Sequence, residues 1–173
     1  MIKIKKRLSI NAKKVDRFLI NFLKRQKKSL LVKPMKYGVV GGGKKIRSTI
    51  IFDTGKIFNI KNSKLINICS AVECIHSYSL IHDDLPCMDD DSIRRGKPST
   101  HIKFGEASAV LAGSSLLTLA FEIIADKKYL LHPKIKNEII VSLASCSGHT
   151  GIAGGQELDL KYENKKKKIN QII

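Results

Sequence analysis

The stretch ECIHSYSLIHDDLPCMDDDSIRRGKPSTHIKFGEASAVLAG, residues 73–113, decides which fold and chemistry we expect of this chain. Five of its aspartates fall within nine residues: Asp83, Asp84, Asp89, Asp90 and Asp91. Carboxylates this close repel one another unless water or a cation separates them. Several together suit a hard divalent cation, and Mg²⁺ is usually held by a few carboxylates together with phosphate oxygens. An acidic loop that is merely solvated is the alternative interpretation.

The spacing within this cluster predicts a bend in the chain. Asp83 and Asp89 are six residues apart, and this spacing does not place two side chains on one face of a regular helix. Pro86 lies between them, lacks an amide donor and clashes with the carbonyl group four residues earlier, so a helix should end or distort there. Such a bend would bring Asp83 and Asp89 to one shared metal ion.

Cationic side chains lie close to the aspartates in sequence or follow a run of glycines. They are Arg94 and Arg95 after the aspartates, and Lys44, Lys45 and Arg47 after Gly41-Gly42-Gly43. Guanidinium groups bind phosphate with two parallel hydrogen bonds, whereas an ammonium group acts as a compact charge. Glycines let backbone amides approach an anion where a helix begins. The spacing is not that of a Walker loop. Acids and cations together predict a ligand that carries phosphate groups.

The hydrophobic periodicity predicts an all-α fold, and no alternating strand pattern is present. We expect helices over residues 12–28, 44–58, 63–82, 106–126 and 133–147, a polar loop over 83–98, and a flexible join over 148–155 before a last helix. Ser63 is a candidate cap, and Pro133 suits a first helical turn. We expect a single domain over residues 1–173, with a basic N-terminal segment over residues 1–11.

The charge of the chain is strongly positive and unevenly distributed. It has 32 Lys and Arg against 15 Asp and Glu in 173 residues, a net charge of +17. Residues 1–36 contain 13 of the cations and a single acid, Asp16. A basic segment can bind nucleic acid or anionic lipid, but no aromatic stacking pattern or known nucleic-acid module accompanies this one. We therefore expect a solvated basic face and no nucleic-acid partner.

Composition and cysteine usage predict a cytoplasmic protein. The hydrophobic fraction of 43% is too high for a disordered chain. The cysteines are Cys69, Cys74, Cys87 and Cys146. They form no C-x-x-C pair and no signal peptide is recognisable, so we expect reduced thiols in the core. The uncharged stretch from Ala107 to Phe121 has 15 residues. About 20 are needed to span a bilayer, so no membrane span is expected.

Three stretches, in this order, resemble the trans-polyprenyl diphosphate synthase family, in particular its bacterial farnesyl diphosphate synthase branch. They are GGGKKIRS (41–48), the stretch 73–113 quoted above, and GGQELDL (154–160). The resemblance implies an all-α isoprenoid synthase bundle around a central cavity. It also implies prenyl transfer: an allylic diphosphate, dimethylallyl or geranyl, ionises with the help of Mg²⁺, the alkene of isopentenyl diphosphate attacks the carbocation, and a proton is lost to give farnesyl diphosphate.

The resemblance further implies roles for the acidic motif. Asp83, Asp84 and Asp89 match the first aspartate-rich motif of the family, which binds Mg²⁺ and, through it, the allylic diphosphate. Arg94 matches the residue that contacts the allylic diphosphate directly. These four residues are the catalytic residues that we expect, and the three aspartates are the expected metal ligands.

Further residues match the substrate sites of the family. The isopentenyl diphosphate site is matched by Lys44, Arg47, His76 and Arg95. Gln156 and Asp159 match the G-Q-x-x-D-L element, and one helix face can present both because they are three residues apart. Outside such motifs His76 would be read as a hydrogen-bonded core residue and Gln156 as a cap or a core amide.

Tyr78 carries the expectation about product length. It lies five residues before Asp83, which is about 7.5 Å along a helix axis. In this family the prenyl chain grows towards a floor on the helix before the aspartates, so a bulky ring there implies farnesyl rather than geranylgeranyl. The alternative is that Tyr78 is ordinary core packing.

The sequence also departs from the family. Ser48 replaces the usual Pro after GGK-x-x-R, and Ser114 replaces the usual Asp of the A-G-D-A-L-L segment. Family members have roughly 300 residues, beyond the size of one small domain, and no second aspartate-rich motif is present among these 173. We therefore expect an N-terminal portion of a synthase with impaired activity.

Two other functions are kept as alternatives. One is a non-catalytic partner of a longer synthase that binds prenyl diphosphate without turnover. The other is a basic nucleic-acid-binding protein, which would leave the aspartates unexplained. The resemblance additionally implies a homodimer.

Overall fold

A computed structural model describes residues 2–162 of the chain. The helices are α1 (Ile2–Lys24), α2 (Val32–Val39), α3 (Ile46–Ile57), α4 (Asn62–Asp83), α5 (Thr100–Phe104), α6 (Glu106–Ala125), α7 (Pro133–Ser147) and α8 (Ile152–Tyr162). The strands β1 (Ile93–Arg94) and β2 (Lys97–Pro98) form a small antiparallel hairpin. The predicted all-α fold is confirmed. Residues 1 and 163–173 of the predicted domain lie outside the described residues.

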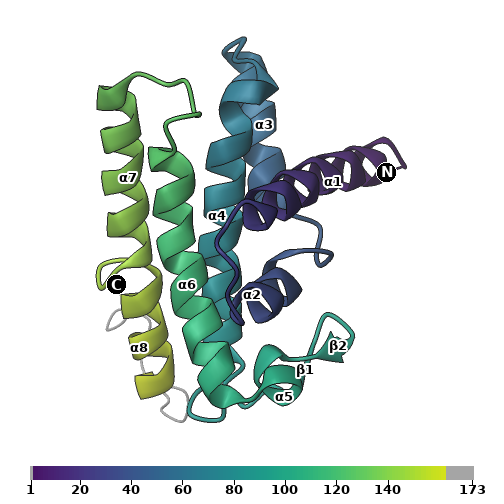
Figure 1. The fold of residues 1–173 in the computed structure, drawn as a ribbon, viewed down its shortest axis with the longest axis vertical. Coiled ribbons are helices and arrows are strands. Elements are labelled where there is room, and N and C mark those ends of the chain that lie inside the picture. Colours follow the sequence, from purple (N-terminus) through teal and green to yellow (C-terminus); the bar gives the residue numbers. More distant parts are fainter. Residues whose placement is uncertain (1, 163–173) are drawn as a thin grey trace.

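Helices α4 and α6 lie side by side at the centre of the fold. Figure 1 shows α3, α4, α6 and α7 running along the long axis of the molecule, with α1 lying across α3 and α4. The core between them is apolar and includes the fully buried side chains of Leu19 in α1, Phe52 in α3, Cys69 in α4 and Leu116 in α6. Burial of these faces is what stabilises helices that are not all strongly amphipathic on their own.

A glycine sets the close approach of α4 and α6. A Cβ atom at Gly113 would collide with the imidazole of His82. That ring fills the space and places its Nε2 3.1 Å from the carbonyl oxygen of Val110. The C-terminal end of α4, where the aspartates begin, is therefore pressed against α6.

The ends of the predicted helices differ from those observed at several points. Helix α1 begins at Ile2 rather than near residue 12, so residues 2–11 of the predicted basic segment are its first turns. Helix α4 begins at Asn62 after Lys61, and Ser63 is not its cap. Pro133 occupies the first turn of α7 as predicted. The prediction of a flexible join over residues 148–155 is wrong for its second half, because α8 begins at Ile152.

Three elements lacked a recognisable signal in the sequence. Helix α2 has eight residues and contains Pro34 and Gly38, which hide its periodicity. Pro34 lies in the first turn, where a missing amide donor costs no hydrogen bond. Helix α5 and the β1–β2 hairpin lie in or directly after the segment predicted as a polar loop. All three are too short for hydrophobic periodicity to reveal them.

The cysteines divide into two classes. Cys69 and Cys74 are fully buried, and burial raises the pKa of each thiol to about 12. Cys87 and Cys146 are exposed, so the prediction of a core position is wrong for these two.

Helix α6 bears on the membrane expectation. Among residues 2–162, α6 is the one helix that is long and apolar enough to cross a membrane, judged by its length of 20 residues and its composition alone. The length argument made from the uncharged stretch therefore does not hold. Its apolar face is occupied within the fold, since Ala109, Ala112 and Leu116 are fully buried.

Candidate active site

The acidic motif forms the bend that its spacing predicts. Helix α4 ends at Asp83, and the chain turns back so that the main-chain N–H of Asp89 donates to the carbonyl oxygen of Asp83 at 2.9 Å. Burial, followed by the negative charges of Asp89 and Asp84, raises the pKa of the Asp83 carboxyl. Asp83 and Asp89 thus share one acidic neighbourhood at the end of α4, which a cation would relieve.

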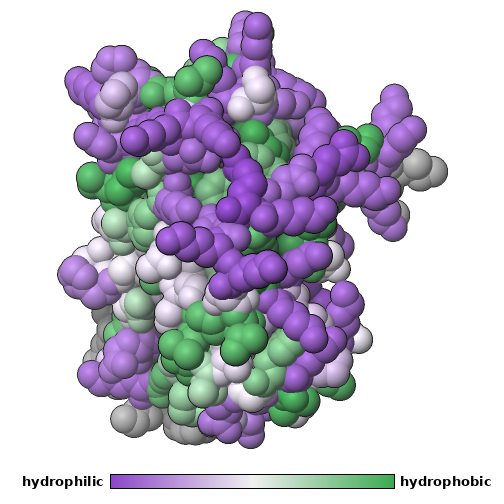
Figure 2. Space-filling view, in the orientation of Figure 1, coloured by the Kyte–Doolittle hydropathy of each residue, from purple (hydrophilic) through white to green (hydrophobic). Residues whose placement is uncertain are grey.

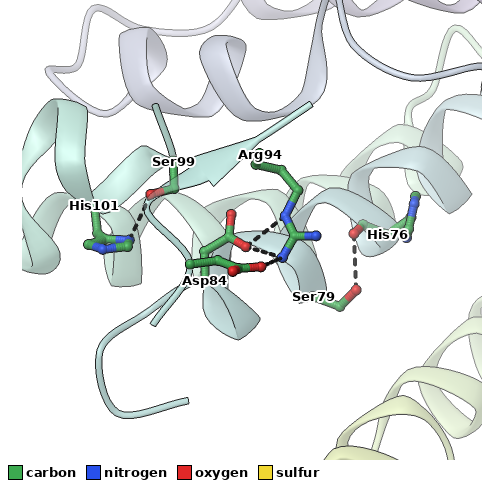
Figure 3. Close-up of polar contacts among 7 residues, drawn as sticks. His76, Ser79, Asp84, Arg94, Ser99 and His101 are labelled. Atoms are coloured by element: carbon green, nitrogen blue, oxygen red, sulfur yellow. Dashed lines mark hydrogen bonds and ion pairs between the residues drawn. The ribbon is translucent and has the colours of Figure 1, made fainter. Parts of the chain in front are cut away.

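The third predicted metal ligand is turned elsewhere. Asp84 is buried, and its Oδ1 accepts hydrogen bonds from Nε of Arg94 at 2.7 Å and from one of its terminal nitrogens. The same terminal nitrogen donates to Asp91 at 2.9 Å. Figure 3 shows the Arg94 guanidinium lying against Asp84. Within residues 2–162 no group of three His, Cys, Asp or Glu side chains is gathered for a metal ion. In this structure, then, the three predicted ligands do not form one cluster.

The cations predicted to bind a diphosphate converge on one cavity. A cavity of about 290 Å³ is lined by Lys44 just before α3, Arg47 in its first turn, His76 from α4 and Arg95 after β1, together with Lys45 and Glu73. Arg94 lines a neighbouring cavity of about 150 Å³, and Arg95 lines both. The segments that supply these groups are far apart in sequence, so only the fold brings them together.

The pKa of His76 reflects the positive charge around the 290 Å³ cavity. Burial, and then the positive charge of Arg47, lower the pKa of its imidazole to about 4, with Arg95 and Lys45 acting in the same direction. The negative charge of Glu73 opposes them. The Ser79 hydroxyl donates to the main-chain oxygen of His76 at 3.0 Å and not to its ring (Figure 3). His76 is therefore neutral at pH 7 and can offer either ring nitrogen to a ligand.

Glu73 is a buried residue of this cavity that sequence reasoning missed. Its Oε1 accepts the main-chain N–H of Ser48 at 3.3 Å and the Ser48 hydroxyl at 2.8 Å. Ser48 lies in the first turn of α3, where main-chain donors have no partner within the helix. Glu73 of α4 thus accepts hydrogen bonds from donors in the first turn of α3 that would otherwise lack a partner. The departure at Ser48 adds two donors that a proline could not provide.

Three predicted residues lie apart from this cavity. Gln156 is half-buried and Asp159 exposed on α8, and neither is among the described residues that line the two cavities. Tyr78 is half-buried in α4, with its ring edge-on to His82 at a centroid distance of 5.3 Å. Burial, together with Asp83, raises the pKa of its phenol. Tyr78 therefore stands next to the end of α4 from which the aspartates extend.

Several relatives of known sequence are farnesyl diphosphate synthases. That of Escherichia coli (strain K12) is 49% identical over 139 residues, which are 78% of this chain and 46% of that protein. That of Buchnera aphidicola subsp. Acyrthosiphon pisum (strain APS) is 44% identical over 159 residues, 90% of this chain and 55% of that protein. The chain spans about half the length of these curated relatives.

Solved structures share the fold. The chain matches an apo FPP/GFPP synthase from Zymomonas mobilis with a TM-score of 0.90 and 40% identity, covering 97% of this chain and 61% of that one. It matches a geranyltransferase from Legionella pneumophila with a TM-score of 0.91 and 32% identity. This match covers 98% of this chain and 60% of the geranyltransferase chain. These likenesses confirm the resemblance found in the sequence. Residues 28–172 match the polyprenyl synthetase family, and the chain belongs to that family.

Proposed function

We propose that this chain takes part in prenyl transfer, in which dimethylallyl or geranyl diphosphate is joined to isopentenyl diphosphate to give farnesyl diphosphate. The observation that carries the proposal is the convergence of Lys44, Arg47, His76 and Arg95 on one cavity beside the aspartate bend. Three permanent cations and a neutral imidazole suit a diphosphate that is bound without metal. We assign this cavity to isopentenyl diphosphate.

The aspartate bend is the proposed site of the allylic diphosphate. The carboxylates of Asp83 and Asp89 would hold Mg²⁺, which their shared acidic neighbourhood suits. Once bound, Mg²⁺ would neutralise the charge that develops on the departing diphosphate. Arg94 would contact the diphosphate from the other side. Asp84 is proposed as the partner that orients Arg94, because its carboxylate is already paired with that guanidinium.

The remaining parts of the proposal concern product length, compartment and assembly. The Tyr78 ring is proposed as the floor that limits the product to farnesyl. In a prenyl-transfer assay, Tyr78→Ala should yield longer products, and an unchanged product would refute this assignment. A cytoplasmic location agrees with the four free cysteines. Gln156 and Asp159 as substrate-binding residues, and a homodimer, stay predictions.

The test combines turnover and binding. The purified chain would be incubated with radiolabelled isopentenyl diphosphate, geranyl diphosphate and Mg²⁺, and product formation compared with that of the Lys44→Ala and Arg47→Ala variants. Turnover that falls at least tenfold in the variants supports the proposal. Calorimetry with isopentenyl diphosphate would reveal binding separately. If neither turnover nor binding is detected, the proposal is wrong.

A second function is favoured by one observation. Within residues 2–162 the predicted diphosphate-binding cations meet at one cavity, whereas the three predicted metal ligands do not form one cluster. This alternative is a non-catalytic partner of a longer synthase. Saturable diphosphate binding without turnover, together with co-purification of a longer homologue, would support it over catalysis.

A further inference from the structure

A single carboxylate of α1 contacts both ends of the triple-glycine loop, residues 41–45. The main-chain N–H of Gly41 donates to Oδ2 of Asp16 at 3.3 Å. At the other end of the loop, Nζ of Lys45 lies 3.3 Å from Oδ1 of the same carboxylate. Asp16 is the one acid among 13 cations in residues 1–36. Its contacts set it apart from the exposed lysines and arginines of α1, and Figure 2 shows hydrophilic residues over much of this part of the surface.

Lys45 is directed inward, unlike the lysine beside it. Its side chain is only 2% exposed, and Nζ also donates to the carbonyl oxygen of Val39 at 2.8 Å. Its backbone has a φ of 44°, in the left-handed region that residues other than glycine rarely adopt. This conformation persists where the surroundings hold it in place. Both lysines line the cavity, but only Lys44 is exposed, whereas the ammonium group of Lys45 is paired with Asp16.

The loop also fixes the position of Arg95. A Cβ atom at Gly43 would lie 2.8 Å from Cζ of Arg95, and one at Gly42 would lie 3.0 Å from a terminal nitrogen of the same guanidinium. The backbone of the loop is thus the wall against which Arg95 packs. A shift of the loop would move this wall and displace Lys44 together with Arg95.

We propose that Asp16 and Lys45 are positioning residues for the diphosphate cavity: their ion pair, with the Gly41 hydrogen bond, holds the triple-glycine loop where Lys44 and Arg95 converge on one anion. This inference rests on the proposed function, because it assumes that the cavity binds a diphosphate. It adds two residues that lie outside the set predicted to touch substrate. Asp16 acts entirely through the loop, since it does not line the cavity.

The direction in which one substitution changes the Kd for pyrophosphate distinguishes a positioning role from a purely electrostatic one. Asp16→Asn removes a negative charge close to a site for an anion, so charge alone would strengthen the binding of pyrophosphate. A positioning role predicts the opposite. We expect the Kd for pyrophosphate, measured by calorimetry on the folded chain, to rise about three- to tenfold, the range set by the loss of one hydrogen bond.

Asp53→Asn is the matched control. Asp53 of α3 also carries one negative charge and pairs with cations, Arg7 at 3.1 Å and Lys56 at 3.9 Å. Its removal changes the net charge by the same amount and should leave the Kd for pyrophosphate within about twofold of the wild type, because a surface ion pair contributes little. Lys45→Arg, which keeps the inward cation, should bind more tightly than Lys45→Met.

Hydrogen exchange reports on the loop without any ligand. In Asp16→Asn the amides of residues 41–45 should exchange at least threefold faster than in the wild type, while Asp53→Asn leaves them unchanged. Tighter or equal pyrophosphate binding by Asp16→Asn, or unchanged exchange in the loop, overturns the positioning role alone. A wild-type chain that binds no pyrophosphate overturns the proposed function and the positioning role with it.

Discussion

The main-chain N–H of Asp89 donates to the carbonyl oxygen of Asp83 across the turn that ends α4, at a distance of 2.9 Å. In a straight helix, two residues six positions apart would lie on different faces. This hydrogen bond brings Asp83 and Asp89 together in one turn instead. It requires the helix to stop, and Pro86 cannot continue a helix because it lacks an amide donor. The backbones of the two residues are thereby held together, and burial, followed by the charge of Asp89, raises the pKa of the Asp83 carboxyl.

The first prediction concerns these two carboxylates. Asp83→Asn and Asp89→Asn should each weaken Mg²⁺-dependent binding of pyrophosphate about tenfold, because each removes one charged oxygen ligand from a hard cation. Calorimetric titration with and without Mg²⁺ measures the effect. Asp90→Asn is the control, since Asp90 is exposed and follows in the same turn. Equal losses in all three variants would mean that the net charge of the loop matters and not a defined pair.

The second prediction concerns the ion pair of Asp84 and Arg94. Arg94→Met leaves the buried Asp84 carboxylate without its partner and should lower the free energy of unfolding by about 2–4 kcal/mol. Urea denaturation followed by circular dichroism measures it. Adding Asp84→Asn to that variant should restore much of the loss, because the uncompensated charge is then gone. Single and double variants of equal stability would contradict the pairing.

The third prediction concerns the end of α3. Ser48→Ala removes the hydroxyl that donates to the buried Glu73 at 2.8 Å, and should lower the free energy of unfolding by about 1–2 kcal/mol. Ser63→Ala, at an exposed position of α4, is the matched control and should change it by less than about 0.5 kcal/mol. If both variants unfold at the same urea concentration, Glu73 does not depend on this hydroxyl.

The fourth prediction concerns the titration of His76, whose pKa in the folded chain is about 4. The ordinary value is 6.5, so the unfolded chain binds more protons between these two pH values. The contribution of His76 to stability is therefore fully present above about pH 6.5 and is lost as the pH falls through about 4. Arg47→Met removes the positive charge that lowers this pKa most and should raise the pKa of the imidazole.

Nuclear magnetic resonance of the imidazole checks this prediction directly. The midpoint of the His76 titration should move upward in Arg47→Met, towards its ordinary value. Arg25→Met is the control, because Arg25 pairs with Asp126 and does not line this cavity. A His76 midpoint that is the same in all three chains would exclude the cationic cavity as the cause.

Much of the fold and part of the site could be predicted because the signals are local. Apolar periodicity located the long helices α3, α4, α6 and α7 to within a few residues. Pro86 and a six-residue spacing were enough to predict the bend between Asp83 and Asp89. The short helices α2 and α5 could not be predicted in this way, because eight or five residues give too few turns for a periodic signal.

Local patterns in the chain were enough to predict the helical class, the bend in the acidic motif and the kinds of side chain available for a diphosphate, since each depends on neighbours within a turn or two. The partners that those side chains take depend on the packing of elements that are distant in sequence. Asp84 pairs with Arg94 and does not join Asp83 and Asp89. Glu73 accepts from Ser48, and Asp16 accepts from Gly41; the two residues of each pair are 25 positions apart in sequence. Such pairings are set by how helices pack, and spacing along the chain does not encode them.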